Sequence, residues 1–418
     1  MENFPLALVA LFVVFFAYLS WMRRAWAVYF IVGFLPIYVI RFELGALPST
    51  LLEVMILVLT AVFVVKKWKH RRKWKLPWLL PVGMLIAASC VALVISPDTR
   101  AGFGMFKAYI IEPLLFFYVA LNTLHTKKEF EHLLWALGAS TLPIAAMTIA
   151  QLLNFSYIPA PWNDGFKDLR TTALYPYPNA VGLYVAPIVA LFIGVTWDAK
   201  YFDGRKRIAA VVIIALGIMS ILAAVSQGAL FGIAVAFFFF GFFATPWWRI
   251  PLLLTLCVAI AFAISTTREM LIPLVTFTDV SGDVRHVLWQ GTWNLLQARP
   301  ITGAGLAGFP IVYETYKLAK HTEFLLYPHN ILLNFWVELG LAGVVTFSWI
   351  LGLFFKKCAA VFRRGTDFSR LSVAVMGGMV ALLAHGVVDV SFFKNDLAVL
   401  FWVFPLLILS LERIESQE

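Results

Sequence analysis

Charge is scarce in this sequence. Charged residues make up 13% of its 418 residues, whereas a soluble globular domain carries about 25%. This scarcity excludes an ordinary soluble domain. Hydrophobic residues make up 61%, and many lie in runs of the roughly 20 residues that a helix needs to cross about 30 Å of hydrocarbon. Because lipid cannot satisfy bare backbone groups, these runs predict a bundle of membrane helices.

Cysteine is also nearly absent. The three cysteines are Cys90, Cys257 and Cys358, and no two have the spacing of metal ligands. Neither a zinc site nor a disulfide framework is therefore predicted. The N-terminal residues 1–5 lack the basic leader of a cleaved signal peptide, so we expect the first apolar run to be retained as a helix.

Apolar runs divide the chain along its length. They centre on residues 4–22, 26–41, 48–65, 77–95, 104–122, 132–153, 179–197, 207–225, 228–244, 249–265, 330–354, 371–389 and 394–412. The run at 26–41 is short and ends in Arg41, so it is either a span or a re-entrant segment. The predicted fold is an all-α polytopic membrane protein with 12–13 transmembrane helices, forming one transmembrane domain over residues 1–418.

The basic residues follow the same division. A net charge of +10 could suggest a nucleic-acid partner, but the positive-inside rule explains it better. Most Lys and Arg residues lie in one set of alternate loops, including the basic cluster at 66–75. These loops are predicted to be cytoplasmic, as is the C-terminus. The N-terminus is then outside with 13 spans and inside with 12.

This alternation places two long loops outside the membrane, at residues 154–178 and 266–329. The second is much the longest stretch that cannot span, and loops of this length are more often functional than idle. We predict that it forms an extracytoplasmic subdomain inserted between membrane helices. It is expected to contain helices at 283–297 and 309–320.

The helix predicted at 283–297 has recognisable ends and one apolar face. Val284, Leu288 and Leu295 fall near one face, Asp283 could cap the start, and Pro300 lies just past the end.

His329 is the strongest candidate for chemistry. It stands in Tyr327-Pro328-His329-Asn330, where the long loop meets the next membrane helix. A neutral imidazole at such a boundary can take a proton from a hydroxyl group near neutral pH. The alternative is a helix-capping or interfacial histidine with no chemical role.

The residues around His329 form a wider pattern. His329-Asn330, nine residues and then Gly340-x-x-Gly343 match the His-Asn-x9-Gly-x-x-Gly pattern of the O-antigen ligases. Over roughly residues 170–400 the chain resembles this family, which belongs to a superfamily that includes O-antigen polymerases. The remaining matching segments are Pro178-Asn179-Ala180, Arg299–Phe309 and His385-Gly386-Val387-Val388-Asp389.

The resemblance implies a C-type (GT-C) multispanning glycosyltransferase that uses neither a metal nor another cofactor. Such enzymes act on the outer, periplasmic face of the bacterial inner membrane. A ligase transfers a glycan from undecaprenyl pyrophosphate, with inversion, to a sugar hydroxyl of lipid A-core. By the resemblance His329 is the general base. Nothing in the sequence itself predicts a nucleic-acid partner or a second subunit. The expected supporting residues are Asn179, Asn330, Glu338, Gly340 and Gly343.

A pyrophosphate leaving group needs cations or a metal ion to stabilise its developing charge. Arginine suits this role because its planar fork holds two phosphate oxygens. Arg285, on the predicted loop helix, is the first candidate, and Arg170 is the second. The alternative for Arg285 is a salt bridge with Asp283 or Asp279.

Lys107 is a third candidate, since it lies near the outer end of a span, five residues before Glu112. A Lys and a Glu at membrane depth are expensive unless they are paired or functional. A structural ion pair between them is the alternative.

One segment departs from the family pattern. Many relatives carry Ser-Arg-Gly at the outer start of a membrane helix, and this chain has Ser226-Gln227-Gly228. Gln227 can donate a hydrogen bond to the donor substrate but supplies no charge. Either Arg170 or Arg285 compensates, or the donor site differs.

Other functions remain open at this stage. A polymerase would share the loop, the histidine and the arginines, and the acceptor could be a protein or another surface glycan. A transporter or lipid flippase is a remoter alternative. Finally, His385 and Asp389 have helical spacing, which predicts that they share a face of one span.

Overall fold

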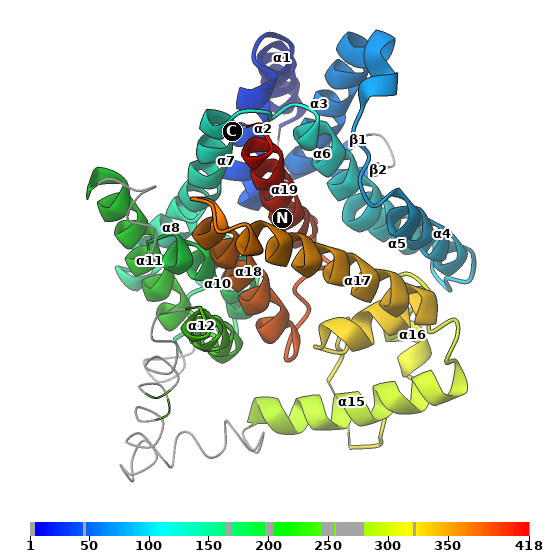
Figure 1. Cartoon of the computed structure of the whole chain (residues 1–418). Helices are drawn as coiled ribbons and strands as arrows, with labels where there is room; N and C mark the ends of the chain where they lie inside the picture. The colour runs from blue at the N-terminus through cyan, green and yellow to red at the C-terminus, as the bar shows by residue number, and fades with distance from the viewer. Residues whose placement is uncertain are drawn as a thin grey trace.

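The computed structural model describes residues 5–44, 47–163, 169–196, 204–243, 280–320 and 323–417, together with residues 252 and 255. Its elements are almost all helices (Figure 1). In the N-terminal half they are α1 (Leu6–Met22), α2 (Arg24–Gly33), η1 (Leu35–Val39), β1 (Arg41–Leu44), β2 (Leu47–Thr50), α3 (Leu51–Lys67), η2 (Trp68–Lys73), α4 (Leu79–Val94), α5 (Thr99–Met105), η3 (Phe106–Ile111), α6 (Glu112–Leu121), α7 (Lys127–Ala139) and α8 (Leu142–Leu152). They continue with α10 (Pro178–Thr196), α11 (Gly204–Ala223), α12 (Gln227–Gly241), α15 (Val280–Ala298), α16 (Phe309–Tyr313), α17 (Ile331–Arg363), α18 (Ser369–Gly386) and α19 (Asn395–Glu415).

The predicted all-α polytopic class is confirmed. Every predicted apolar run that falls on described residues contains a helix, while the run at 249–265 lies outside them except for residues 252 and 255. In the described part of the chain, seven helices are long and apolar enough to cross a membrane. Four shorter apolar helices, α1, α2, α4 and α12, accompany them.

The predicted run at 26–41 is not one continuous helix. Its helix α2 ends at Gly33, a 3₁₀ turn follows, and Arg41 begins a small antiparallel hairpin in which it pairs with Thr50. Thr50 then caps α3 in a capping box with Glu53, which fixes where that helix starts. The hairpin was not predicted, and it carries Arg41 into a cavity described below.

The centre of the bundle is formed by α10 and α19. Both are almost completely buried, and α19 lies in the middle of the bundle in Figure 1. α10 packs against α11, α12 and α18, while α19 packs against α6, α17 and α18. The segments at the ends of α10, α17 and α18 are therefore fixed relative to one another by a solid core.

The long loop is folded where the structure describes it. α15 confirms the predicted helix and is longer at its start, so Asp283 lies in its first turn and does not cap it. The second predicted helix starts at 309 but ends at Tyr313. Leu288 and Leu295 are buried with Phe309 and residues of α17, so α15 and α16 form a small core against that helix (Figure 1). Residues 266–279, including Asp279, lie outside the described residues.

A break in α17 explains one glycine of the motif. Gly340 has φ +67° and ψ −170°, and a Cβ at this position would overlap the Ile301 carbonyl oxygen. Only glycine adopts this conformation freely and admits the approaching backbone. Leu341 N–H then donates to the Ile301 carbonyl at 3.0 Å, and Ala304 N–H donates to the Val337 carbonyl at 2.7 Å. The turn after α15 is thus docked on α17.

Candidate active site

His329 is held in an unusual backbone conformation at the start of α17. Its φ of +46° is uncommon for a residue with a side chain. The next residue, Asn330, caps α17 by accepting from Leu333 N–H at 3.0 Å and donates to the Val387 carbonyl at 2.9 Å. On the other side, Trp289 of α15 donates its indole N–H to the Pro328 carbonyl at 2.9 Å. His329 is therefore fixed by α15, α17 and the end of α18 together.

The imidazole of His329 is paired with a buried carboxylate. Its Nδ1 lies 3.1 Å from Asp389 Oδ1, and the two side chains are 19% and 1% exposed. Burial by itself raises the pKa of Asp389, but the adjacent His329 ring lowers it to about 2. An ionised carboxylate can only accept hydrogen bonds, so Nδ1 is the donor of this pair, and in the neutral form of the ring Nε2 would carry the lone pair.

The expectation that His385 and Asp389 share a helix face is wrong. α18 ends at Gly386, and Asp389 lies in the following turn, where Val390 N–H donates to Oδ1 at 2.8 Å. The turn directs the carboxylate to His329, although His385 is close enough to lower the pKa of Asp389 further.

Asp389 also connects His329 to Arg170. Asn179, at the start of α10, donates to Asp389 Oδ2 at 3.4 Å and accepts from Arg170 Nη2 at 2.9 Å. Arg170 Nε donates to the Ala224 carbonyl at 3.0 Å. The structure thus brings together three of the predicted site residues, His329, Asn179 and Arg170, through a carboxylate that was not predicted.

Arg170 and Arg285 lie close enough to affect one another. Burial lowers the pKa of Arg170, and the positive charge of Arg285 lowers it further. No ion pair involves either guanidinium within the described residues, and in particular none joins Arg285 to Asp283. Two neighbouring guanidinium groups without a carboxylate repel each other, so this region is suited to an anion.

Gln227 lies beside the same region. It is the exposed first residue of α12, and Arg170 Nη2 donates to the carbonyl of Val225, two residues earlier, at 3.2 Å. A Cβ on Gly228 would lie 2.6 Å from the His385 ring, so this segment packs directly on α18. The start of α12 is therefore adjacent to Arg170, and compensation for Gln227 by Arg170 stays a prediction.

Lys107 occupies a different network. Its Nζ lies 2.8 Å from Glu53 Oε2 and 4.0 Å from Glu112 Oε1. Glu53 also accepts from Asn395 of α19 at 2.8 Å. The structure thus contains the structural ion pair considered above, extended by Glu53. No described contact joins Lys107 to His329, and its role in donor binding stays a prediction.

Glu338 and Gly343 make their contacts within α17 and with the turn after α15, and their supporting role stays a prediction. Glu338 is buried in α17 and accepts from Ala307 N–H at 2.6 Å, which holds the glycine-rich turn 303–308 in place. The same turn is anchored to α4, because Leu306 N–H donates to the Ala92 carbonyl at 3.1 Å. Gly343 is buried just past the break at Gly340, where there is little room for a side chain.

Sequence reasoning did not identify Asp389 as the partner of His329, nor Tyr177 and Tyr327 as its neighbours. The Tyr327 ring lies 4.7 Å from that of His329, and its hydroxyl lies 3.2 Å from the Tyr177 hydroxyl. Tyr327 and Asp389 lie in segments that the sequence analysis had singled out as motifs, and Tyr177 lies directly before a third, so position in or beside a motif was the available signal.

One comparison with known proteins matches this chain. A family model described as O-antigen ligase matches residues 209–348, a range that contains Gln227, Arg285 and His329. It also contains Gly340 and Gly343. No curated protein matches the chain.

Proposed function

From the match to the O-antigen ligase family model over residues 209–348, we propose that the chain is a member of this family and transfers a glycan from undecaprenyl pyrophosphate to a hydroxyl of lipid A-core or a similar acceptor. At the coarser level it is a multi-pass membrane enzyme of the O-antigen ligase and polymerase type. The observation that carries the finer proposal is the His329–Asp389 pair, connected through Asn179 to Arg170, which forms no ion pair with any described residue.

His329 acts as the general base. Because Asp389 accepts the Nδ1 hydrogen, Nε2 is free to take the proton of the acceptor hydroxyl. The resulting positive imidazolium is stabilised by the buried carboxylate, which also holds the ring in one orientation. The same arrangement, a histidine base oriented by a carboxylate, recurs in unrelated hydrolases.

The acceptor oxygen then attacks the anomeric carbon of the donor sugar. The new C–O bond forms as the bond from that carbon to the pyrophosphate breaks, and the configuration inverts. The leaving pyrophosphate takes the electron pair, and its added negative charge is stabilised by Arg285 and Arg170. Gln227 contributes a hydrogen-bond donor. The arginines supply the positive charge that a metal ion would otherwise supply.

The site is proposed to face the periplasm. Arg285 is carried by the long loop, which the charge distribution places outside, and His329 lies where that loop enters α17. Lipid-linked donor and lipid-linked acceptor would both reach this boundary from within the membrane.

The test is transfer by the purified protein, with an undecaprenyl-pyrophosphate glycan as donor and lipid A-core as acceptor. His329→Ala should abolish transfer, whereas His132→Ala, which changes an exposed histidine on α7, should leave it unchanged. If wild type elongates the lipid-linked glycan and ignores the core, the enzyme is a polymerase. Transfer by His329→Ala at the wild-type rate would refute the role of His329. Absence of transfer to any hydroxyl would favour a transporter.

A further inference from the structure

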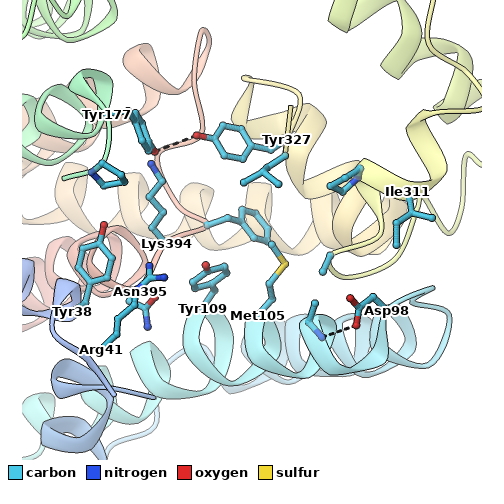
Figure 2. Close-up of a pocket in the computed structure, with 16 residues that line it drawn as sticks. Tyr38, Arg41, Asp98, Met105, Tyr109, Tyr177, Ile311, Tyr327, Lys394 and Asn395 are labelled. Atoms are coloured by element: carbon cyan, nitrogen blue, oxygen red, sulfur yellow. Dashed lines mark hydrogen bonds between the residues drawn. The ribbon is translucent and has the colours of Figure 1, made fainter. Parts of the chain in front are cut away.

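A cavity of about 470 Å³ adjoins the His329 site and shares Tyr327 with it. Residues from distant parts of the chain line it, and Figure 2 shows the hydroxyl groups of Tyr177 and Tyr327 pointing toward one another beside the end of Lys394. Its volume falls in the range of about 300–1,000 Å³ that is typical of small-molecule sites. The polar and aromatic residues that matter here are Tyr38, Arg41, Tyr109, Tyr177, Tyr327 and Lys394.

The positive charge of the Lys394 side chain is poorly compensated by the protein. Its Nζ is buried without a hydrogen-bond partner among the described residues and lies 4.1 Å from the centre of the Tyr177 ring. The residue directly precedes α19, and the N-terminus of a helix carries a positive partial charge that disfavours an ammonium group. Burial also lowers the pKa of Lys394. Nearby Asp396 offsets part of this cost, but its oxygens accept from Tyr175 and Leu397.

A second cation approaches from another part of the fold. Arg41 reaches the cavity from the β1–β2 hairpin, and no ion pair holds it within the described residues (Figure 2). Asp98, a carboxylate on the same cavity, accepts from Ala101 N–H at 2.9 Å as the cap of α5. Two cations and a helix N-terminus around one cavity favour an anionic ligand.

The remaining walls are suited to a sugar. Tyr38, Tyr109 and Tyr177 present hydroxyl groups that can donate or accept hydrogen bonds, and their rings offer flat apolar faces. Phe393 and Met105 complete the apolar surface. A small inorganic anion would use only the cations, whereas a saccharide would also use the aromatic walls.

We propose that this cavity is the acceptor subsite and binds a saccharide that bears an anionic group, a phosphate or a carboxylate, against Lys394 and Arg41. The inference rests on the proposed function. The donor pyrophosphate would lie at Arg170 and Arg285, which are connected to His329 through Asp389. The acceptor would approach past Tyr327, so that its hydroxyl reaches His329 Nε2 without the two anionic groups competing for the same cations.

Binding can be tested without turnover. Purified protein in lipid nanodiscs would be titrated calorimetrically with glucose 6-phosphate, glucuronic acid, glucose and inorganic phosphate. We expect the charged sugars to bind about tenfold more tightly than glucose, as an ionic hydrogen bond provides. Whichever of glucose 6-phosphate and glucuronic acid binds more tightly identifies the preferred anionic group. Equal binding of charged and neutral sugars, or of inorganic phosphate and glucose 6-phosphate, would overturn the proposal.

Variants assign the binding to this cavity. Lys394→Met and Arg41→Gln should each remove the preference for charged sugars, and Lys394→Arg should keep it. Lys317→Met removes a loop charge that is paired with Glu314 and should have no effect. Since Arg41 is exposed, its variant should fold even if Lys394→Met does not. An unchanged preference in Arg41→Gln would count against the cavity.

Kinetics then separate the acceptor from the donor. In both variants the KM for an anionic acceptor should rise about tenfold, while the KM for the donor stays unchanged. A rise in the donor KM alone would assign the cavity to the donor and refute the inference. If wild type transferred to no acceptor, the proposed function would fail, but binding of charged sugars that depends on Lys394 would still uphold an anionic-saccharide site.

Discussion

Replacing Asp389 by asparagine tests the pairing on which the proposed mechanism depends. Aspartate and asparagine side chains have the same shape, but the asparagine amide carries no charge and can donate a hydrogen bond to His329 Nδ1. That donation would favour the imidazole form with its hydrogen on Nε2, which cannot act as a base. The buried position of Asp389 leaves water little room to replace the carboxylate.

The size of the effect follows from the pKa of Asp389. That value falls from 3.8 to about 2 despite burial, mainly because of His329, and such a change corresponds to about 2 kcal/mol. Losing that stabilisation of the imidazolium costs about 30-fold in rate. The unfavourable tautomer adds to it, so we expect turnover to fall by about 10²–10⁴-fold.

The assay is the turnover number of the purified variant with saturating lipid-linked donor and acceptor. The donor KM should change little, because Asp389 contacts the base and not the pyrophosphate in the proposed mechanism. Ser391→Ala is a matched control, since Ser391 is buried in the same turn and its hydroxyl makes no hydrogen bond to described residues. Retention of more than half of the wild-type turnover by Asp389→Asn would refute the reasoning.

Three further predictions concern the leaving group, the metal and the break in α17. Arg285→Ala should reduce kcat/KM for the donor by about 10²-fold, with Arg285→Lys intermediate and Arg299→Ala unaffected; normal donor binding in Arg285→Ala would contradict the phosphate role. Activity should be unchanged in excess EDTA, and inhibition that added Mg²⁺ reverses would contradict the metal-free mechanism. Gly340→Ala should lower the melting temperature and cost about 1–3 kcal/mol, because the new Cβ overlaps the Ile301 carbonyl. Gly352→Ala in the same helix places its Cβ in open space and should leave the melting temperature unchanged or raise it. Equal melting temperatures for Gly340→Ala and Gly352→Ala would disprove the steric explanation.

The local features of the chain were predictable from sequence because they depend on neighbouring residues. Apolar runs long enough for lipid located the helices, and the periodicity of Leu288 and Leu295 located α15. The spacing of His329, Gly340 and Gly343 indicated the family that the match over residues 209–348 supports. The break in α17 then explained why glycine is needed at position 340.

The associations between distant residues were decided only by the tertiary structure. Asp389 is 60 residues from His329, and their pairing depends on α18 ending three residues before Asp389. Asn179 reaches Asp389 across 210 residues because the start of α10 packs beside the end of α18.

The same holds for the cavity of Arg41 and Lys394. Its cations come from the hairpin after α2 and from the start of α19. Periodicity and spacing describe one segment at a time, whereas this cavity depends on how the bundle packs around α19. The sequence by itself therefore determined the class of protein, its helices and the segment that carries His329, and the packing of the bundle determined which groups surround His329.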